Sequence, residues 1–156
     1  MTEPETLKDL QRLSYFLDDA IPIPGTPYRI GIDPLLGLLP VSGDLITGLA
    51  SAYIVFRAAQ LGISRMTLLR MVMNITLDTI LGSLPFAGDI FDTVWKANQK
   101  NITLLERSLN SPQTGKKADQ WFVILVLAGF LLIVLAIALL SLAVLTGIIR
   151  AIWVNF

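Results

Sequence analysis

The residues whose types and spacing suggest chemistry in this 156-residue chain are acidic. Clustered carboxylates bind hard cations such as calcium or magnesium through oxygen, or relay protons when they are partly removed from water. The chain has no histidine and no cysteine, so a metal site or a proton path must rest on oxygen ligands. The candidate cation or proton site consists of five aspartates: Asp33, Asp44, Asp78, Asp89 and Asp92.

Four of these aspartates lie in a segment that occurs twice. Residues 33–45 (DPLLGLLPVSGDL) align without gaps with residues 78–90 (DTILGSLPFAGDI), and seven of the thirteen positions are identical. The identical positions include both aspartates and the glycine, proline and glycine between them. Similarity at a fixed offset indicates an internal duplication. Because glycine ends a helix and proline cannot continue one, each copy is predicted to form a helix, a corner and a second helix.

The predicted helices place the two corners at one end of a bundle. One helix is expected from Asp44 to about Leu61 and the next from Ser64 to about Leu84, joined by a tight turn at Gly62. The second helix must run back alongside the first, so the two corners should meet. This juxtaposition would gather the five aspartates into one cluster.

Helix capping is the alternative role of the same residues. Asp44 and Asp89 stand where an N-cap belongs, and Asp33 precedes a proline at the first helical position. Such a cap stabilises a helix by about 0.5–2 kcal/mol. The sequence favours capping over a cation or proton site. It lacks the GxSxG, P-loop, dinucleotide-binding and HExxH motifs, so we expect no enzyme activity and no cofactor.

The rest of the region before the C-terminal segment is also predicted to be helical. From Glu5 to about Asp19, apolar residues recur at spacings of three and four, which predicts an amphipathic helix that needs a partner. Three prolines within residues 22–27 favour extended chain after it. A further helix is expected from Asp89 to about Leu109.

Some polar and sulfur-containing side chains on these helices are expected to have structural roles. Asn74 and Asn98 should form hydrogen bonds between helices, because buried amides are usually satisfied by their neighbours. Methionines fill irregular gaps in cores. Three of them are expected to do so here: Met66, Met71 and Met73.

The strongest signal in the sequence is an uncharged run near the C-terminus. Thirty consecutive residues between Asp119 and Arg150 carry no charge, whereas about 20 apolar residues suffice to cross a bilayer. Trp121 and Trp153 fit the aromatic belts of the two membrane interfaces. More basic residues precede this span than follow it, which predicts the N-terminal side in the cytoplasm. The preceding ones are Lys100, Arg107, Lys116 and Lys117.

The two corners also carry a family resemblance, together with the residues around them. Those residues are Ile23-Pro24-Gly25-Thr26 ahead, Met71 and Asn74 between, and Trp95-Lys96-Ala97-Asn98 with Asn101 behind. Over about residues 15–109 the chain resembles a bacterial family catalogued as domain of unknown function 4112. Ser42 departs from its pattern, where the family tends to have glycine. The resemblance implies a shared domain and supplies no activity, substrate or cofactor.

The expected fold is all-α: a small helical bundle built on a duplicated helix-corner-helix unit, followed by a transmembrane helix. Pro112 and Gly115 in a polar run mark a linker between the two parts. The expected divisions are an amphipathic helix at 1–20, the duplicated domain at 21–109 with units near 33–62 and 78–109, the linker at 110–119 and the transmembrane helix at 120–153.

These expectations define a function class. Twelve basic residues balance twelve acidic ones, so no overall field favours nucleic acid. We expect a non-enzymatic, membrane-anchored helical module that acts as a partner-binding or scaffolding subunit of a membrane complex. Its partners would be the lipid bilayer and another membrane protein or a second copy, in a bacterial inner or thylakoid membrane. The alternative is an oligomeric ion- or proton-translocating membrane protein that uses the acidic corners.

Overall fold

The computed structural model describes residues 3–32, 35–36, 42–82, 95–110 and 117–155. Its elements are α1 (Glu3–Asp19), β1 (Ile21–Pro22), β2 (Arg29–Ile30), α3 (Ser42–Gln60), α4 (Arg65–Gly82), α6 (Ala97–Asn110) and α7 (Gln120–Asn155).

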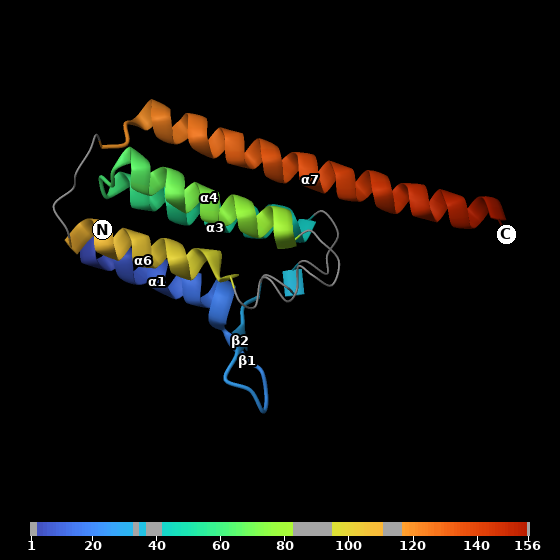
Figure 1. Ribbon diagram of the computed structural model, residues 1–156, viewed down its shortest axis with the longest axis horizontal. Coiled ribbons are helices and arrows are strands. Elements are labelled where there is room, and N and C mark those ends of the chain that lie inside the picture. Colours follow the sequence, from blue (N-terminus) through green and yellow to red (C-terminus); the bar gives the residue numbers. More distant parts are fainter. Residues whose placement is uncertain (1–2, 33–34, 37–41, 83–94, 111–116, 156) are drawn as a thin grey trace.

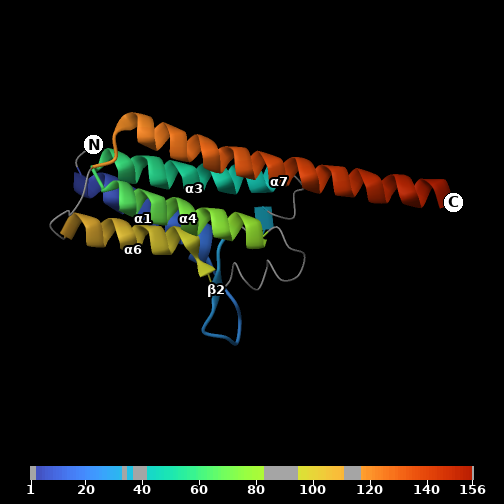
Figure 2. The same ribbon diagram turned by 45° about the horizontal axis from the view of Figure 1, so that its top comes forward.

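The helices lie roughly parallel to one common direction and form a layered bundle (Figures 1 and 2). Helices α1 and α6 pack together on one side, and α3 and α4 lie between them and α7. Helix α7 continues well past the end of the other helices (Figure 1). The predicted all-α class is confirmed, because the described elements form a helical bundle with one long apolar C-terminal helix. The two corners of the predicted duplicated unit lie outside the described residues.

Helix α1 is amphipathic, as its spacing predicts. Leu10 and Leu17 are almost completely buried, and Leu7 and Leu13 pack beside them against the core. By its spacing from Leu13, Phe16 belongs to the same apolar series, but about half of its surface is exposed. Phe16 directly precedes Leu17, so it points away from the buried side of the helix.

A short hairpin follows α1 where the prolines predict extended chain. Strand β1 pairs antiparallel with β2, with Ile21 opposite Ile30. Gly31 then passes so close to α1 that a Cβ atom there would overlap the backbone oxygen of Leu17. Only glycine permits this approach. The hairpin is therefore held tightly against the C-terminal end of α1.

Helices α3 and α4 form the predicted antiparallel pair. Gly62 adopts a positive φ of 80° in the connecting turn and donates its N–H to the carbonyl oxygen of Ala59, 3.0 Å away. This geometry is typical of a glycine that ends a helix. Helix α3 begins at Ser42, so Asp44 lies in its first turn and not at the N-cap position expected from the sequence.

The predicted continuous helix from Asp89 to Leu109 is wrong at one point. Lys96 has a positive φ of 49°, which interrupts helical geometry, and α6 begins at the next residue, Ala97. The amphipathic pattern of the sequence is the same on both sides of this break. Periodicity alone therefore does not reveal it.

Helix α7 consists of two stretches with different surroundings. In the first, which we call the packed half (residues 120–138), buried side chains recur at spacings of seven and four residues, on the face that contacts the bundle. They are Val123, Phe130, Val134 and Ala138. In the second, the bare half (residues 139–153), every residue is exposed. The whole helix is long and apolar enough to cross a membrane.

The start of α7 is docked on the turn between α3 and α4. The Ala118 N–H donates to the carbonyl oxygen of Ile63 at 3.0 Å, and Asp119 accepts a hydrogen bond from the backbone N–H of Phe122 at 2.9 Å. Asp119 also forms an ion pair with Arg65, whose guanidinium lies over the Phe122 ring. The last residues of the expected linker thus fix α7 to the bundle.

Candidate functional site

The predicted acidic cluster falls largely on residues outside the described part of the chain. Asp33, Asp89 and Asp92 lie outside it, and Asp44 is described only as backbone within α3. Helix α3 begins, and α4 ends, at the end of the bundle from which the bare half projects (Figure 1). Within the described residues, no three acidic side chains lie close enough together to hold a metal ion.

Asp78 is the member of the predicted cluster whose side chain is described. It lies in α4, is partly buried, and faces Lys100 of α6 closely enough to favour the charged form of that lysine. Partial burial nevertheless lowers the pKa of Lys100, and Asp78 opposes this effect. Asp78 therefore contributes an acidic group to the surface between α4 and α6.

A buried polar network joins the helices where the sequence predicts hydrogen-bonded amides. Asn74 donates from Nδ2 to Oδ1 of Asn101 at 2.9 Å, and Asn101 donates to the carbonyl oxygen of Met71 at 3.0 Å. Asn98 donates to Oδ1 of Asp18 at 2.8 Å. The predicted inter-helix roles of Asn74 and Asn98 are confirmed. The methionine prediction holds for Met71, which is buried, and is wrong for Met66 and Met73, which are exposed.

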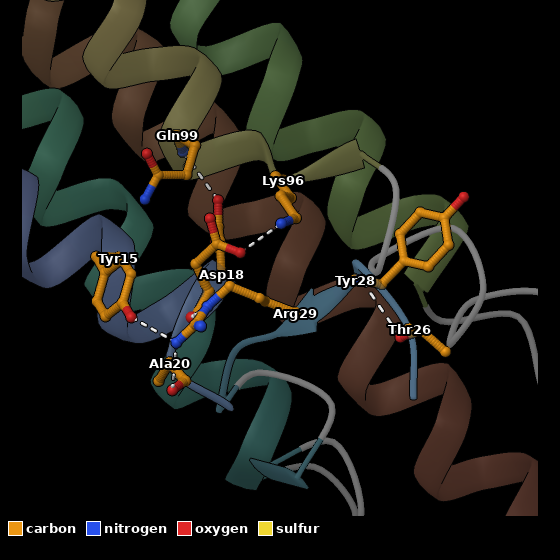
Figure 3. A network of polar contacts seen from close by, with 9 residues as sticks. Tyr15, Asp18, Ala20, Thr26, Tyr28, Arg29, Lys96 and Gln99 are labelled. Carbon is orange, nitrogen blue, oxygen red and sulfur yellow. Dashed lines mark hydrogen bonds and ion pairs between the residues drawn. The ribbon is translucent and has the colours of Figure 1, made fainter. Parts of the chain in front are cut away.

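Asp18 caps α6 from another helix. Its Oδ2 accepts a hydrogen bond from the backbone N–H of Gln99 at 2.8 Å, in the first turn of α6 (Figure 3). A carboxylate at this position is favoured by the helix dipole. Burial raises the pKa of Asp18, although the hydrogen bonds from Asn98 and Gln99 oppose this effect. The contact joins α1 to α6 next to Lys96, where the helical geometry is interrupted.

Two cations close the same end of the bundle. Lys96 forms an ion pair with Asp19, next to the Asp18 cap. Arg29 of the hairpin donates to the hydroxyl of Tyr15 at 2.6 Å and to the carbonyl oxygen of Ala20 at 3.3 Å (Figure 3). Each of these charged side chains contacts another group of the protein, which indicates a structural role for this end of the bundle.

A groove between α4 and α6 is lined by three cationic side chains. It has a volume of about 430 Å³. Its charged walls are Arg70 from α4 and Lys100 and Arg107 from α6. The Lys100 ammonium lies 3.0 Å from the centre of the Trp95 ring. The remaining lining residues are Met73, Asn74, Leu77, Thr103 and Leu104.

The outward faces of α3 and α4 are apolar, in contrast to the mostly polar outward face of α1. Exposed apolar side chains recur along both helices at spacings of three and four, which places each set on one face. On α3 they are Ile46, Leu49, Tyr53 and Phe56, and on α4 they are Met66, Leu69, Met73, Leu77 and Ile80. A soluble domain rarely exposes so continuous an apolar surface without a use for it.

The sequence carried partial signals for these features. Arg70 interrupts a largely apolar helix, and Lys100 and Arg107 are seven residues apart and so share a face of α6. These two facts point to cations on both helices, but their convergence depends on the packing of α4 against α6. The role of Asp18 depends on the break at Lys96, for which the sequence has no signal.

Comparison with known proteins identifies one family. The family model described as "Domain of unknown function (DUF4112)" matches residues 6–109, which comprise the bundle through α6. The packed and bare halves of α7 lie outside the match. No curated protein and no solved structure matches the chain.

Proposed function

We propose that this chain, which belongs to the DUF4112 family, is a non-enzymatic, membrane-anchored module that binds another membrane protein as a subunit of a membrane complex. One observation carries the proposal: apolar side chains are exposed along the bare half of α7 and also along the outward faces of α3 and α4. A helix that only anchored the chain would not require apolar faces on its neighbours.

The length of α7 supports a spanning position with the bundle at one interface. A hydrocarbon core of about 30 Å takes about 20 helical residues at about 1.5 Å each. Counted back from the exposed Trp153, such a core ends near Ile133, inside the packed half. Leu77 and Ile80 of α4 would then lie near the hydrocarbon boundary, and the start of α7 would lie outside the membrane.

The distribution of basic residues supports an orientation with the bundle in the cytoplasm. Lys100, Arg107, Lys116 and Lys117 precede the span, and Arg150 follows it. Positive residues close to a span are retained on the cytoplasmic side. A bacterial inner membrane or a thylakoid membrane is the proposed location.

The partner surface we propose is the outward face of α3. Tyr53 and Phe56 lie on it, well away from the hairpin, and both are substantially exposed. Tyrosine and phenylalanine are enriched at protein interfaces because they bury a large area with little loss of conformational freedom. A helix of another membrane protein fits a surface that is continuous with the membrane-facing side of α7.

Site-specific photo-cross-linking in native membranes tests this proposal. The photoreactive residue p-benzoylphenylalanine replaces Tyr53 on α3 or, as a matched aromatic control, Tyr28 on the hairpin, which has a similar exposed fraction. We expect a discrete adduct with one membrane protein, or with a second copy of the chain, from position 53 and none from position 28. A protein that stays monomeric and forms no adduct at position 53 would refute partner binding.

Ion or proton translocation through the acidic corners stays a prediction from the sequence. Four of its five aspartate side chains lie outside the described residues, and the fifth, Asp78, faces a lysine.

A further inference from the structure

We propose that the groove between α4 and α6 binds the anionic headgroup of a membrane phospholipid, with the lipid's acyl chains following the exposed apolar stripe of α4. This inference rests on the proposed membrane anchoring and adds to it a specific lipid site. It depends on three features: unpaired cations, an adjoining apolar path, and a position near the membrane surface.

Two of the three cations in the groove lack a carboxylate partner among the described residues. Arg70 and Arg107 form no ion pair with any carboxylate in the described part of the chain. Lys100 is the cation that faces an acidic group, Asp78. Three positive charges against one negative leave an excess of two. Arginine side chains can contact a phosphate through two parallel N–H donors, so this pair suits a phosphate better than a single charge would.

The groove opens onto an apolar path. Met73 and Leu77 line it and also belong to the exposed stripe of α4. Leu104 adds an apolar side chain from α6. Inorganic phosphate has no apolar part that could contact these side chains, whereas a phospholipid would bury its acyl chains against them. The combination therefore favours an amphiphilic anion over a free one.

The groove also lies at a suitable depth. Gly48 of α3 packs against Val134, which fixes the level of α3 along α7. Because α4 runs antiparallel to α3, the C-terminal end of α4, near Leu77, lies toward the bare half. Along α4, Arg70 lies about 10 Å farther from the bare half than Leu77 does. With the hydrocarbon boundary near Ile133, the apolar end of the groove meets the acyl region and the arginines meet the headgroups.

Native mass spectrometry of the full chain in a nonionic detergent tests the site, because it measures lipid binding directly. Phosphatidylglycerol serves as the anionic lipid and phosphatidylcholine as the neutral one. We expect the wild-type chain to bind phosphatidylglycerol at least about 10-fold more tightly, and the double variant Arg70→Gln/Arg107→Gln to bind it about 30-fold more weakly, since each cation near an anionic lipid contributes about 5-fold.

Two further variants control for charge and folding. Lys8→Gln/Arg12→Gln removes the same charge from a separate groove on α1 and should leave the affinity within about 3-fold of wild type, as expected for lost long-range attraction. Arg70→Lys/Arg107→Lys keeps the charge and should retain more affinity than the Gln pair. Each variant is compared by circular dichroism, since exposed charge removal leaves the fold intact.

Three results would overturn the proposal: equal affinity for the two lipids, equal losses in the α1 and groove variants, or displacement of the lipid by millimolar inorganic phosphate, which would identify a free anion as the ligand. Alkaline extraction of cell membranes tests the anchor separately. A chain that resists extraction but shows no lipid preference refutes the groove alone, and a chain that is extracted but prefers phosphatidylglycerol refutes the anchor alone.

Discussion

The packed and bare halves of α7 have nearly the same composition but different surroundings. Both are rich in Leu, Ile, Val and Ala. In the packed half, Phe130 and Val134 are buried against α3 and α4, whereas no residue from 139 to 153 is buried. One continuous helix therefore serves as a core element along one stretch and as an exposed apolar helix along the other. Hydropathy averages over these roles, and only the packing separates them.

The largest expected effect comes from a charge in the packed half. Val134→Asp places a carboxylate in a fully packed contact with α3, and we expect it to destabilise the bundle by more than about 4 kcal/mol, because a buried unpaired charge has no compensating partner. Unfolding of the detergent-solubilised chain, followed by circular dichroism, measures this loss. A loss below about 1 kcal/mol would mean that the packed half contributes little to the bundle.

The matched control places the same charge in the bare half. Leu140→Asp should change bundle stability by less than about 0.5 kcal/mol, because Leu140 is exposed. It should instead reduce retention in membranes under alkaline extraction, since an aspartate near the centre of a spanning helix costs about 2.5–3.5 kcal/mol. Together the two variants separate packing from anchoring. If Leu140→Asp unfolds the bundle, the distinction between the halves is wrong.

A defect on the side of the bundle away from α7 is expected to lower the stability of the bundle without affecting the bare half. Asp18→Ala leaves the Asn98 amide and the Gln99 N–H without their acceptor, so we expect a loss of about 3 kcal/mol and faster proteolysis of the bundle, with membrane retention unchanged. The neighbouring Asp19→Ala breaks an ion pair whose side chains are 26% and 22% exposed, and it should cost less than the loss of the Asp18 cap, about 1 kcal/mol. Equal losses from the two variants would contradict the role of Asp18 as a cap.

The pH dependence of the bundle follows from the same aspartate. Burial raises the pKa of Asp18 in the folded state, so the folded chain retains the proton at pH values where the unfolded chain has lost it. The stability that protonation contributes is present below the unfolded pKa of about 4 and is lost as the pH rises through the folded pKa. Unfolding experiments from pH 7 to 4 should show wild type gaining stability relative to Asp18→Asn. A constant difference would exclude this titration.

A smaller effect is expected where α3 and α7 approach most closely. A Cβ atom on Gly48 would lie 3.2 Å from both methyl groups of Val134, which is slightly too close. We expect Gly48→Ala to cost about 1 kcal/mol, and Val134→Ala, which removes those methyl groups, to relieve this crowding in the double variant. A double-mutant cycle measures the coupling. Gly129→Ala, in an open part of the packed half, is the control for helix propensity, which favours alanine over glycine by up to about 1 kcal/mol in both variants.

The sequence predicts the positions of the helices better than the contacts between them. The stripe of α1, the turn at Gly62 and the length of α7 were visible because periodicity, glycine and hydropathy are local signals. The break at Lys96 was not, since a lysine with positive φ depends on its ion pair with Asp19 and on the Asp18 cap beyond it. The packing of α7 on the bundle was missed for a similar reason, because a lipid-facing leucine and a core leucine look alike in sequence.

The candidate site follows the same rule. The acidic residues stood out because they repeat in sequence, yet their side chains lie mostly outside the described residues. The cations of the groove do not belong to the sequence repeat. They come from α4 and α6, and the sequence does not predict which residues of these two helices lie opposite each other. Arg70 and Arg107 become neighbours only once Asn74 pairs with Asn101 across α4 and α6.

Because α7 has no described break from Gln120 to Asn155, the bundle and the bare half cannot pivot independently at residue 138. If the bare half spans a bilayer thinner than itself, the mismatch would favour a tilt of the whole molecule. The bundle would then rotate through the same angle as α7, to which it is fixed. Membrane thickness would thereby set how far the cationic groove stands from the lipid surface.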